Sequence, residues 1–158
     1  MTIALFAGRF DPVTMGHLDT AQRAAALFDE LVVGVAESKS TLFSTDERVE
    51  LFRGATEEIK NTRVLPYGGL TVNFARSLGA TVLIRSMRGN TDFENEFDQA
   101  LMNRQMAEEI ESVYLIARLE HLYISGTRIR EVAALGYDVT GLVPANVAEA
   151  LRRKFGEA

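Results

Sequence analysis

Thr14, Gly16 and His17 form a Thr-x-Gly-His motif where a buried apolar run gives way to a helical pattern. Gly8 ends the apolar run, and threonine is a residue type that favours the N-cap of a helix. Gly16 and His17 would then lie in the first helical turn, where unpaired N–H groups and the helix dipole attract an anion. Gly16 leaves room for a phosphate, and the His17 imidazole can donate a hydrogen bond to it. The motif therefore predicts an anion site, with an ordinary strand-to-helix turn as the alternative interpretation.

Five short runs rich in Val, Ile and Leu indicate the strands that must position this motif. Each run is typical of a buried strand, and segments with helical spacing lie between the runs. This alternation predicts a doubly wound α/β fold with a five-stranded parallel sheet, Rossmann-like in architecture. Ligands of such sheets bind beyond the carboxyl ends of the strands, which is where the motif lies. The predicted strands are Thr2–Phe6, Leu31–Val35, Arg63–Leu65, Thr81–Ile84 and Ser112–Ile116.

Capping residues and apolar spacing place the helices. One helix begins after Thr14, a second opens at Ser44 with a capping-box spacing, and a final helix covers Pro144–Phe155. A long helix is predicted around Thr91–Glu109, and its polar side would normally face water. The apolar side of this long helix holds Phe93, Phe97, Ala100 and Leu101, and the polar side holds Asp92, Glu96, Gln99 and Asn103.

Composition and charge exclude several functional classes. The length of 158 residues predicts one domain, residues 1–158, and 47% apolar with 25% charged residues is average for a globular protein. The 17 Lys and Arg against 22 Asp and Glu give a net charge of −5, which argues against nucleic acid or anionic membranes as partners. The sequence has no cysteine, which excludes disulfides, thiolate metal sites and a cysteine nucleophile. With no signal-peptide or membrane-span pattern either, we expect a cytoplasmic protein.

Two motifs together resemble a known superfamily. The first block, Gly8-Arg9-Phe10-Asp11-Pro12-Val13-Thr14-Met15-Gly16-His17, is similar to the signature of the nucleotidyltransferases named for their His-x-Gly-His or Thr-x-Gly-His motif. The second block, Ile124-Ser125-Gly126-Thr127-Arg128-Ile129-Arg130, is similar to the superfamily's Ile-Ser-x-Thr-x-Ile-Arg hallmark. That hallmark cradles ATP phosphates at a second helix N-terminus. Two hallmarks in the expected order, more than a hundred residues apart, make the resemblance specific.

Within this superfamily the whole chain looks like a member of the phosphopantetheine adenylyltransferase family. Supporting blocks run from end to end of the sequence. They are Leu27–Glu30, Lys39–Arg48, Asn73–Arg76, Val82–Arg88, Asp92–Glu96, Met102–Arg104, Glu111–Leu115, Asp138–Thr140 and Val143–Val147. The resemblance implies transfer of the adenylyl group of ATP to 4′-phosphopantetheine, which gives dephospho-coenzyme A and pyrophosphate. It also implies Mg²⁺ with ATP as the co-substrate, a homohexamer and feedback binding of coenzyme A.

The family's catalytic and acceptor-binding roles carry over residue by residue. His17 would contact the triphosphate and stabilise the transition state, and it would form the catalytic set with Lys39 and Arg88. Lys39 and Arg85 would hold the phosphate of phosphopantetheine, and Thr71 would contact the pantetheine arm. No residue is assigned to a metal. The acceptor-binding residues implied by the resemblance are Arg9, Lys39, Thr71 and Arg85.

The ATP-binding residues implied by the resemblance come from four parts of the chain. They are Arg9, Phe10, His17, Ser86, Met87, Arg88, Glu96, His121, Leu122, Tyr123, Ile124, Ser125, Gly126 and Thr127. The chemistry agrees with this assignment, because fixed cations and N–H donors must hold the negative charge of two phosphorylated substrates. The acceptor phosphate is already ionised near neutral pH, so positioning and charge stabilisation can supply most of the catalysis.

Each residue also has a plainer interpretation. Lys39 would otherwise be a solvated loop lysine, and His121 an exposed loop residue. Arg85 and Arg88 could instead pair with Asp92 or Glu96. Only the order that these residues share with one family favours the functional interpretation.

Several positions depart from the family pattern. Arg9 stands where the family has Thr or Ser, and it would either add a bidentate phosphate contact or occupy space that the α-phosphate needs. Gly126 replaces a serine in the second motif, and Ser86 replaces a glycine. Met15 replaces an asparagine and Asn95 a tyrosine. The departures leave the effect on rate and acceptor open.

Three alternatives remain from the sequence. One is an adenylyl- or cytidylyltransferase for another phosphate acceptor, such as nicotinamide mononucleotide; Lys39 and the pair Arg85 and Arg88 speak against it. Another is a non-catalytic ATP-binding regulatory module, in keeping with Arg9 and Gly126. A flavodoxin-like signalling domain would need an acidic cluster at the strand ends, where this chain carries cations.

Overall fold

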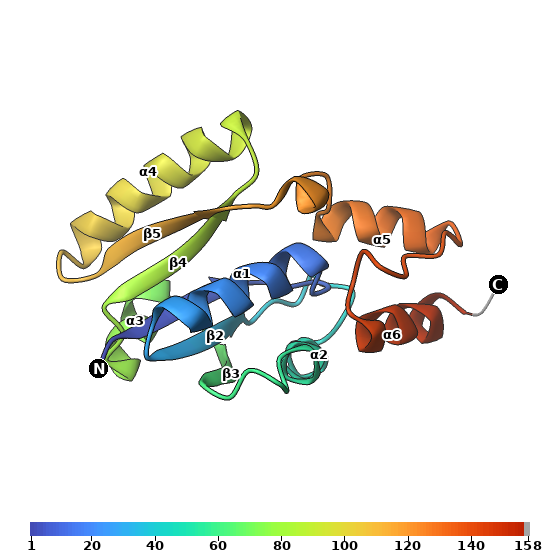
Figure 1. Ribbon diagram of the computed structural model, residues 1–158, viewed down its shortest axis with the longest axis horizontal. Helices are drawn as coiled ribbons and strands as arrows, with labels where there is room; N and C mark the ends of the chain where they lie inside the picture. The colour runs from blue at the N-terminus through green and yellow to red at the C-terminus, as the bar shows by residue number, and fades with distance from the viewer. Residues whose placement is uncertain (157–158) are drawn as a thin grey trace.

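The computed structural model describes residues 1–156, apart from the side chains of residues 90 and 91. Within that range the chain alternates strands and helices as the sequence predicts (Figure 1). The strands are β1 (Ile3–Gly8), β2 (Glu30–Ala36), β3 (Thr62–Tyr67), β4 (Val82–Met87) and β5 (Glu111–Ile116). The helices are α1 (Met15–Leu27), α2 (Thr45–Ala55), α3 (Thr71–Leu78), α4 (Asn90–Met106), the 3-10 turn Leu119–His121, α5 (Gly126–Ala134) and α6 (Ala145–Phe155). No helix within the described residues is long and apolar enough to span a membrane.

The five strands form one parallel sheet in the order β3-β2-β1-β4-β5. The chain order reverses between β1 and β4, which makes this pair the topological switch point of a doubly wound sheet. The predicted fold class is confirmed. The prediction of a single domain over residues 1–158 stays a prediction, and its last two residues lie outside the described range.

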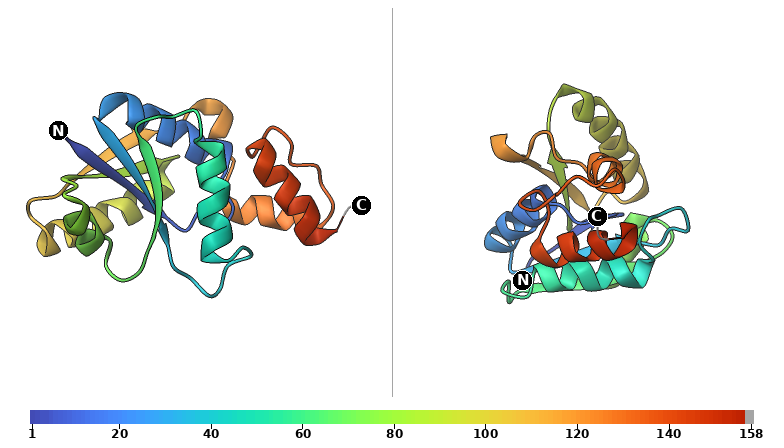
Figure 2. Two further views of the ribbon diagram at one scale, coloured as in Figure 1. Left: turned by 90° about the horizontal axis from the view of Figure 1, so that it is seen from below. Right: turned by 90° about the vertical axis from the view of Figure 1, so that its right-hand side faces the viewer.

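Apolar residues cover both faces of the sheet. The larger core packs the sheet against α1, α2, α5 and α6, and the smaller core packs it against α3 and the end of α4. Figure 2 shows α1 on one side of the strands and α3 with α4 on the other. Helices α5 and α6 lie beyond the carboxyl ends of the strands (Figure 1), so α5 can contribute to a site at that edge.

The N-caps follow the sequence closely. Thr14 caps α1 and Ser44 caps α2, each in a full capping box. Pro144 precedes α6, and Gly156 ends it with a φ of 81°. These ends are set by short local patterns, which is why the sequence predicts them well.

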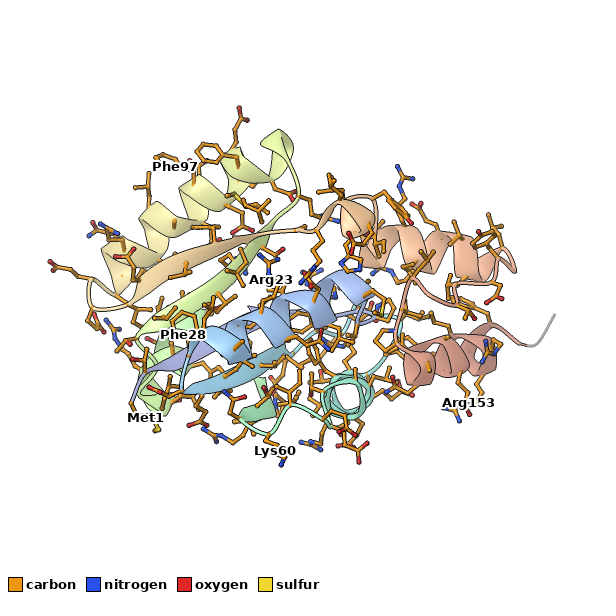
Figure 3. All side chains as sticks on the ribbon, in the orientation of Figure 1. Met1, Arg23, Phe28, Lys60, Phe97 and Arg153 are labelled. Carbon is orange, nitrogen blue, oxygen red and sulfur yellow. The ribbon has the colours of Figure 1, made fainter. Side chains whose placement is uncertain are left out.

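Helix α4 reverses the usual orientation of an amphipathic helix. Phe93, Phe97 and Leu101 are 54%, 53% and 54% exposed, whereas Asn103 on the polar side is 7% exposed. Figure 3 shows Phe97 on the outer side of α4, away from β5. The expectation that the polar side faces water is wrong for Asn103, which accepts a hydrogen bond from Gln99 and lines a cavity with Leu5 and Leu83 of the sheet.

Candidate active site

The candidate site lies where β1 and β4 separate. Strand β1 pairs with β2 through Gly8, but it pairs with β4 only at Ala4, Leu5 and Phe6. Beyond Phe6 the two strands no longer hydrogen bond to each other, and Arg85 Nη1 donates instead to the carbonyl oxygen of Ala7 at 3.3 Å. A cavity of about 250 Å³ opens at this gap between the first turns of α1 and α5.

The imidazole of His17 is held in place by the capping box of α1. Its Nδ1 accepts a hydrogen bond from the Thr14 backbone N–H at 3.0 Å, and the His17 N–H donates to Thr14 Oγ1 at 3.3 Å. Because Nδ1 is an acceptor, the proton of the neutral ring lies on Nε2. Burial, with a smaller contribution from Arg88, lowers the pKa of His17 from 6.5 to about 4. At neutral pH His17 is therefore an uncharged hydrogen-bond donor in a fixed orientation.

The Phe10 ring packs against the His17 ring. Phe10 is buried, with its ring edge-to-face against His17 at 5.0 Å between centroids and against Phe52 at 4.7 Å. A Cβ atom at Gly8 would lie 3.0 Å from the Phe10 ring, so a larger residue at this position would force the ring to shift. The buried ring makes Phe10 a support for His17.

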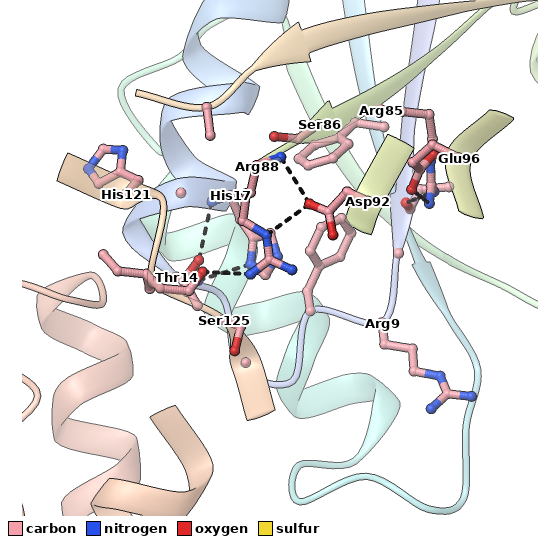
Figure 4. A pocket seen from close by; sticks show the side chains of 18 residues that line it. Arg9, Thr14, His17, Arg85, Ser86, Arg88, Asp92, Glu96, His121 and Ser125 are labelled. Carbon is pink, nitrogen blue, oxygen red and sulfur yellow. Dashed lines mark hydrogen bonds and ion pairs between the residues drawn. The ribbon is translucent and has the colours of Figure 1, made fainter. Parts of the chain in front are cut away.

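Arg85 and Arg88 reach the cavity in pairs with acidic residues of α4. Arg85 makes two hydrogen bonds to Glu96, at 2.8 and 2.7 Å, and these raise the pKa of Arg85. Arg88 pairs with Asp92 at 3.3 Å, and its Nη1 also donates to the Ile124 carbonyl oxygen at 3.0 Å. Figure 4 shows Arg88 and Asp92 next to His17, with Arg85 and Glu96 on the far side of Asp92 in this view. Both arginines thus form the ion pairs that the plainer interpretation of the sequence predicts. All four residues also line the cavity.

The N-terminus of α5 forms the opposite wall. Ser125 caps this helix through its side chain, which accepts from the Arg128 N–H at 3.2 Å. A Cβ atom at Gly126 would lie 3.2 Å from the Asp11 carbonyl oxygen, so the two loops approach closely there. The first turn of α5 therefore presents backbone N–H groups to the same space as the first turn of α1.

Most of the predicted site residues meet at this cavity. Those that line it are Arg9, Phe10, His17, Arg85, Ser86, Arg88, Glu96, His121, Ile124, Ser125 and Gly126. Arg9 is exposed, and Figure 4 shows its guanidinium turned away from His17 and Arg88.

Other predicted residues lie outside it. Thr71 lines a neighbouring cavity of about 140 Å³, which shares Ala7 and Arg85 with the first one and also touches Asn103. Lys39 is exposed on the connection after β2. The remaining predicted residues that do not line the first cavity are Met87, Leu122, Tyr123 and Thr127.

Asp92 is a site residue that the sequence assignment leaves out. It accepts hydrogen bonds from both the backbone N–H and the side chain of Arg88. Its position four residues after Arg88 is a signal that the sequence does carry.

The described residues contain no group of three or more His, Asp or Glu side chains that could hold a metal ion. Asp92 and Glu96, the acidic residues at the cavity, are paired with arginines. The side chains at the cavity thus suit an anionic ligand better than a protein-bound cation.

Comparison with known proteins gives a consistent result. A family model described as cytidylyltransferase-like matches residues 5–132. A phosphopantetheine adenylyltransferase of Methylacidiphilum infernorum is 44% identical over 161 residues, which cover 99% of this chain and 93% of that protein. One from Desulforudis audaxviator is 47% identical, with 99% and 97% covered.

A solved structure shares the fold. The crystal structure assigned to a nicotinate-nucleotide adenylyltransferase of Vibrio parahaemolyticus superposes with a TM-score of 0.70 at 16% identity. The match covers 97% of this chain and 93% of that one. At this identity the likeness establishes the architecture alone.

Proposed function

Because the chain belongs to the phosphopantetheine adenylyltransferase family, we propose that it transfers the adenylyl group of ATP to 4′-phosphopantetheine. The products are dephospho-coenzyme A and pyrophosphate, in coenzyme A biosynthesis. The observation that carries the proposal is the convergence of two helix N-termini, His17 and two arginines on the gap between β1 and β4. Such an array suits the triphosphate of ATP.

In the proposed reaction an oxygen of the acceptor phosphate attacks the α-phosphorus of ATP. The bond between the α-phosphorus and the bridging oxygen breaks, and pyrophosphate leaves with the electron pair. His17 Nε2–H would donate to the charge that develops on the phosphoryl oxygens, with no proton transfer. A Cβ atom on Gly16 would meet the protein only at 3.5 and 3.7 Å, so packing within the chain does not require glycine there. An approaching phosphate gives a reason for it.

We assign the arginine pairs to phosphate binding in the same reaction. Arg88 would contact ATP, and Arg85 the phosphate of the acceptor. Asp92 and Glu96 hold both guanidinium groups at the cavity, so contacts within the chain order these cations. Ordering a cation in advance lowers the entropic cost of binding.

The acceptor would enter from the side of α3. Thr71 lines the cavity adjoining Arg85, and its hydroxyl is within 2.9 Å of Tyr67 Oη. A pantetheine arm in that cavity would place its phosphate at Arg85, with Lys39 approaching from the connection after β2. Arg9, an exposed residue of the first cavity, would add a further cation for this phosphate.

Mg²⁺ is proposed as part of the substrate Mg·ATP. The ion would neutralise the departing pyrophosphate. Phosphate oxygens and water would supply most of its ligands, in keeping with the acidic residues at the cavity being paired with arginines. A cytoplasmic location, where ATP is supplied, and feedback binding of coenzyme A belong to the same proposal.

The homohexamer expected from the family is proposed to use the outer face of α4. The Phe93 and Phe97 rings stack there with centroids 5.9 Å apart, and Leu101 continues the exposed apolar row. Contiguous apolar surface of this kind favours contact between copies of the chain. A Phe97→Ser variant is expected to shift the mass in solution to smaller species, as measured by light scattering.

Pyrophosphate release from Mg·ATP tests the proposed reaction. The assay compares 4′-phosphopantetheine with nicotinamide mononucleotide and with a blank that lacks acceptor. Release only with 4′-phosphopantetheine is the expected result. Pyrophosphate release with nicotinamide mononucleotide alone would overturn the acceptor assignment. No release with either acceptor, despite ATP binding in calorimetry, would favour a regulatory module.

A further inference from the structure

Arg48 is a fully buried arginine on α2 that the proposed reaction leaves without a role. It is 0% exposed, and its guanidinium donates to three backbone carbonyl oxygens. Nε donates to Phe43 at 3.1 Å, and Nη1 donates to Arg9 at 2.7 Å and to Ala36 at 2.9 Å. Nη2 donates to Thr45 Oγ1 at 2.9 Å. One side chain therefore ties together the connection after β1, the end of β2 and the residues before α2.

Asp11 makes a second tie between the same segments. This carboxylate is 6% exposed and accepts from the N–H groups of Leu42 at 2.8 Å and Phe43 at 3.0 Å. Burial lowers the pKa of Arg48, and the negative charge of Asp11 acts in the opposite direction. Hydrogen bonds of Arg48 and Asp11 thus connect both ends of the segment 36–45 to the connection between β1 and α1.

The fastened segment carries Lys39, and the connection that anchors it leads directly into the helix of His17. We propose that Arg48 is a positioning residue, which fixes the Lys39 segment against the β1–α1 connection and so places the acceptor phosphate relative to His17. The inference rests on the proposed function for the identity of the acceptor. The mechanical part, that Arg48 holds residues 36–45, does not depend on it.

Stability alone is a poor explanation for this residue. A buried cation loses its hydration, and an apolar side chain of similar volume often stabilises a core equally well. What an apolar side chain cannot do is bridge carbonyl groups from three segments. Arg53 offers a matched contrast on the same helix, because its side chain is 53% exposed and its guanidinium bonds to one backbone carbonyl, that of Val64.

The decisive variant is Arg48→Lys, with Arg53→Lys as the control. Lysine keeps the charge but lacks the planar fork that reaches three carbonyl groups at once. Steady-state kinetics are expected to show KM for 4′-phosphopantetheine raised at least tenfold in Arg48→Lys, with KM for ATP changed less than twofold. Arg53→Lys should leave both constants unchanged. Equal KM shifts for both substrates, or a loss of kcat alone, would mean that Arg48 only stabilises the fold.

Two further measurements keep the inference testable if Arg48→Lys folds poorly or the wild type lacks the proposed activity. Thr45→Val removes one acceptor of the Arg48 fork and should raise KM for the acceptor about threefold. Amide hydrogen exchange needs no substrate. Arg48→Lys or Thr45→Val should speed exchange in residues 36–44 more than in β3, and equal rates in wild type and variant would overturn the positioning role.

Discussion

The first turns of α1 and α5 face the same cavity but are built differently. At α1 the cap is reciprocal, because Thr14 binds the His17 N–H and His17 Nδ1 binds the Thr14 N–H. At α5 the Ser125 side chain caps alone. At α1 one side chain, His17, both completes the cap of the helix and lines the cavity. The chain's own hydrogen bonds therefore fix the orientation of His17, while the start of α5 lines the cavity with Ser125 and Gly126.

Removing the His17 side chain should have the largest effect on the rate of the proposed reaction. His17→Ala is expected to lower kcat by about 10²–10³, the usual cost of losing one donor to a charged transition state. KM for ATP should change far less. His121→Ala removes the other histidine at the cavity, which the resemblance assigns to ATP binding, so it should raise KM for ATP more than it lowers kcat in the pyrophosphate assay. Unchanged turnover in His17→Ala would remove His17 from the proposed mechanism.

Both motifs depart from the family pattern, the first at Arg9 and Met15 and the second at Gly126, and the change at Arg9 should have the largest effect. Loss of a charge-assisted contact of about 1.5–3 kcal/mol should raise KM for 4′-phosphopantetheine by about 10–100-fold in Arg9→Thr. KM for ATP should stay near wild type, because the Arg9 guanidinium turns away from His17 and Arg88. A rise in KM for ATP alone would place Arg9 on the nucleotide instead.

The first turn of α1 should contribute to the pH dependence of stability through His17. The pKa of His17 is about 4 in the folded chain and 6.5 in its ordinary state, so the unfolded chain binds a proton first as pH falls. The contribution of neutral His17 to stability is complete above about pH 6.5 and is lost as pH falls toward 4. Urea unfolding at several pH values measures this slope. His17→Ala should make the slope shallower, and an identical slope in the variant would contradict the assignment.

The two caps should differ in the free energy of unfolding. Replacing an N-cap residue by alanine costs about 0.5–2 kcal/mol. Thr14→Ala is expected near the upper end of that range, because it also loosens the His17 ring, and Ser125→Ala near the lower end. Urea unfolding at pH 7 compares them directly. A larger loss of unfolding free energy in Ser125→Ala than in Thr14→Ala would contradict this prediction.

Gly126→Ser, which restores the family residue at α5, should have the smallest effect. The new Cβ atom would lie 3.2 Å from the Asp11 carbonyl oxygen, so the loop must shift by a few tenths of an ångström. The expected change in KM for ATP is less than about threefold, because the cost of this shift offsets most of the about 0.5–1.5 kcal/mol that one new hydroxyl contact can contribute. A tenfold gain would show that the missing hydroxyl limits ATP binding.

Local patterns predict much of this molecule, and long-range contacts account for what they miss. The five strands and the caps at Thr14 and Ser44 follow from neighbouring residues, and the resemblance names candidates that the fold brings to one cavity. The exposed aromatic side of α4 does not follow from periodicity, because it depends on Glu96 meeting an arginine eleven residues away. Local patterns also do not predict the burial of Arg48, since its carbonyl partners lie up to 39 residues away.

The short pairing between β1 and β4 divides the sheet into two ladders. Strands β3, β2 and β1 form one, β4 and β5 form the other, and only the residues from Ala4 to Phe6 on β1 join them to β4. His17 lies on α1, which connects two strands of the first ladder, whereas Arg85 lies on the second ladder and Arg88 directly follows it. The cavity lies where the two ladders separate, and residues from both line it. A single ligand in that cavity would therefore touch both ladders and add a connection between them that the strand pairing does not supply.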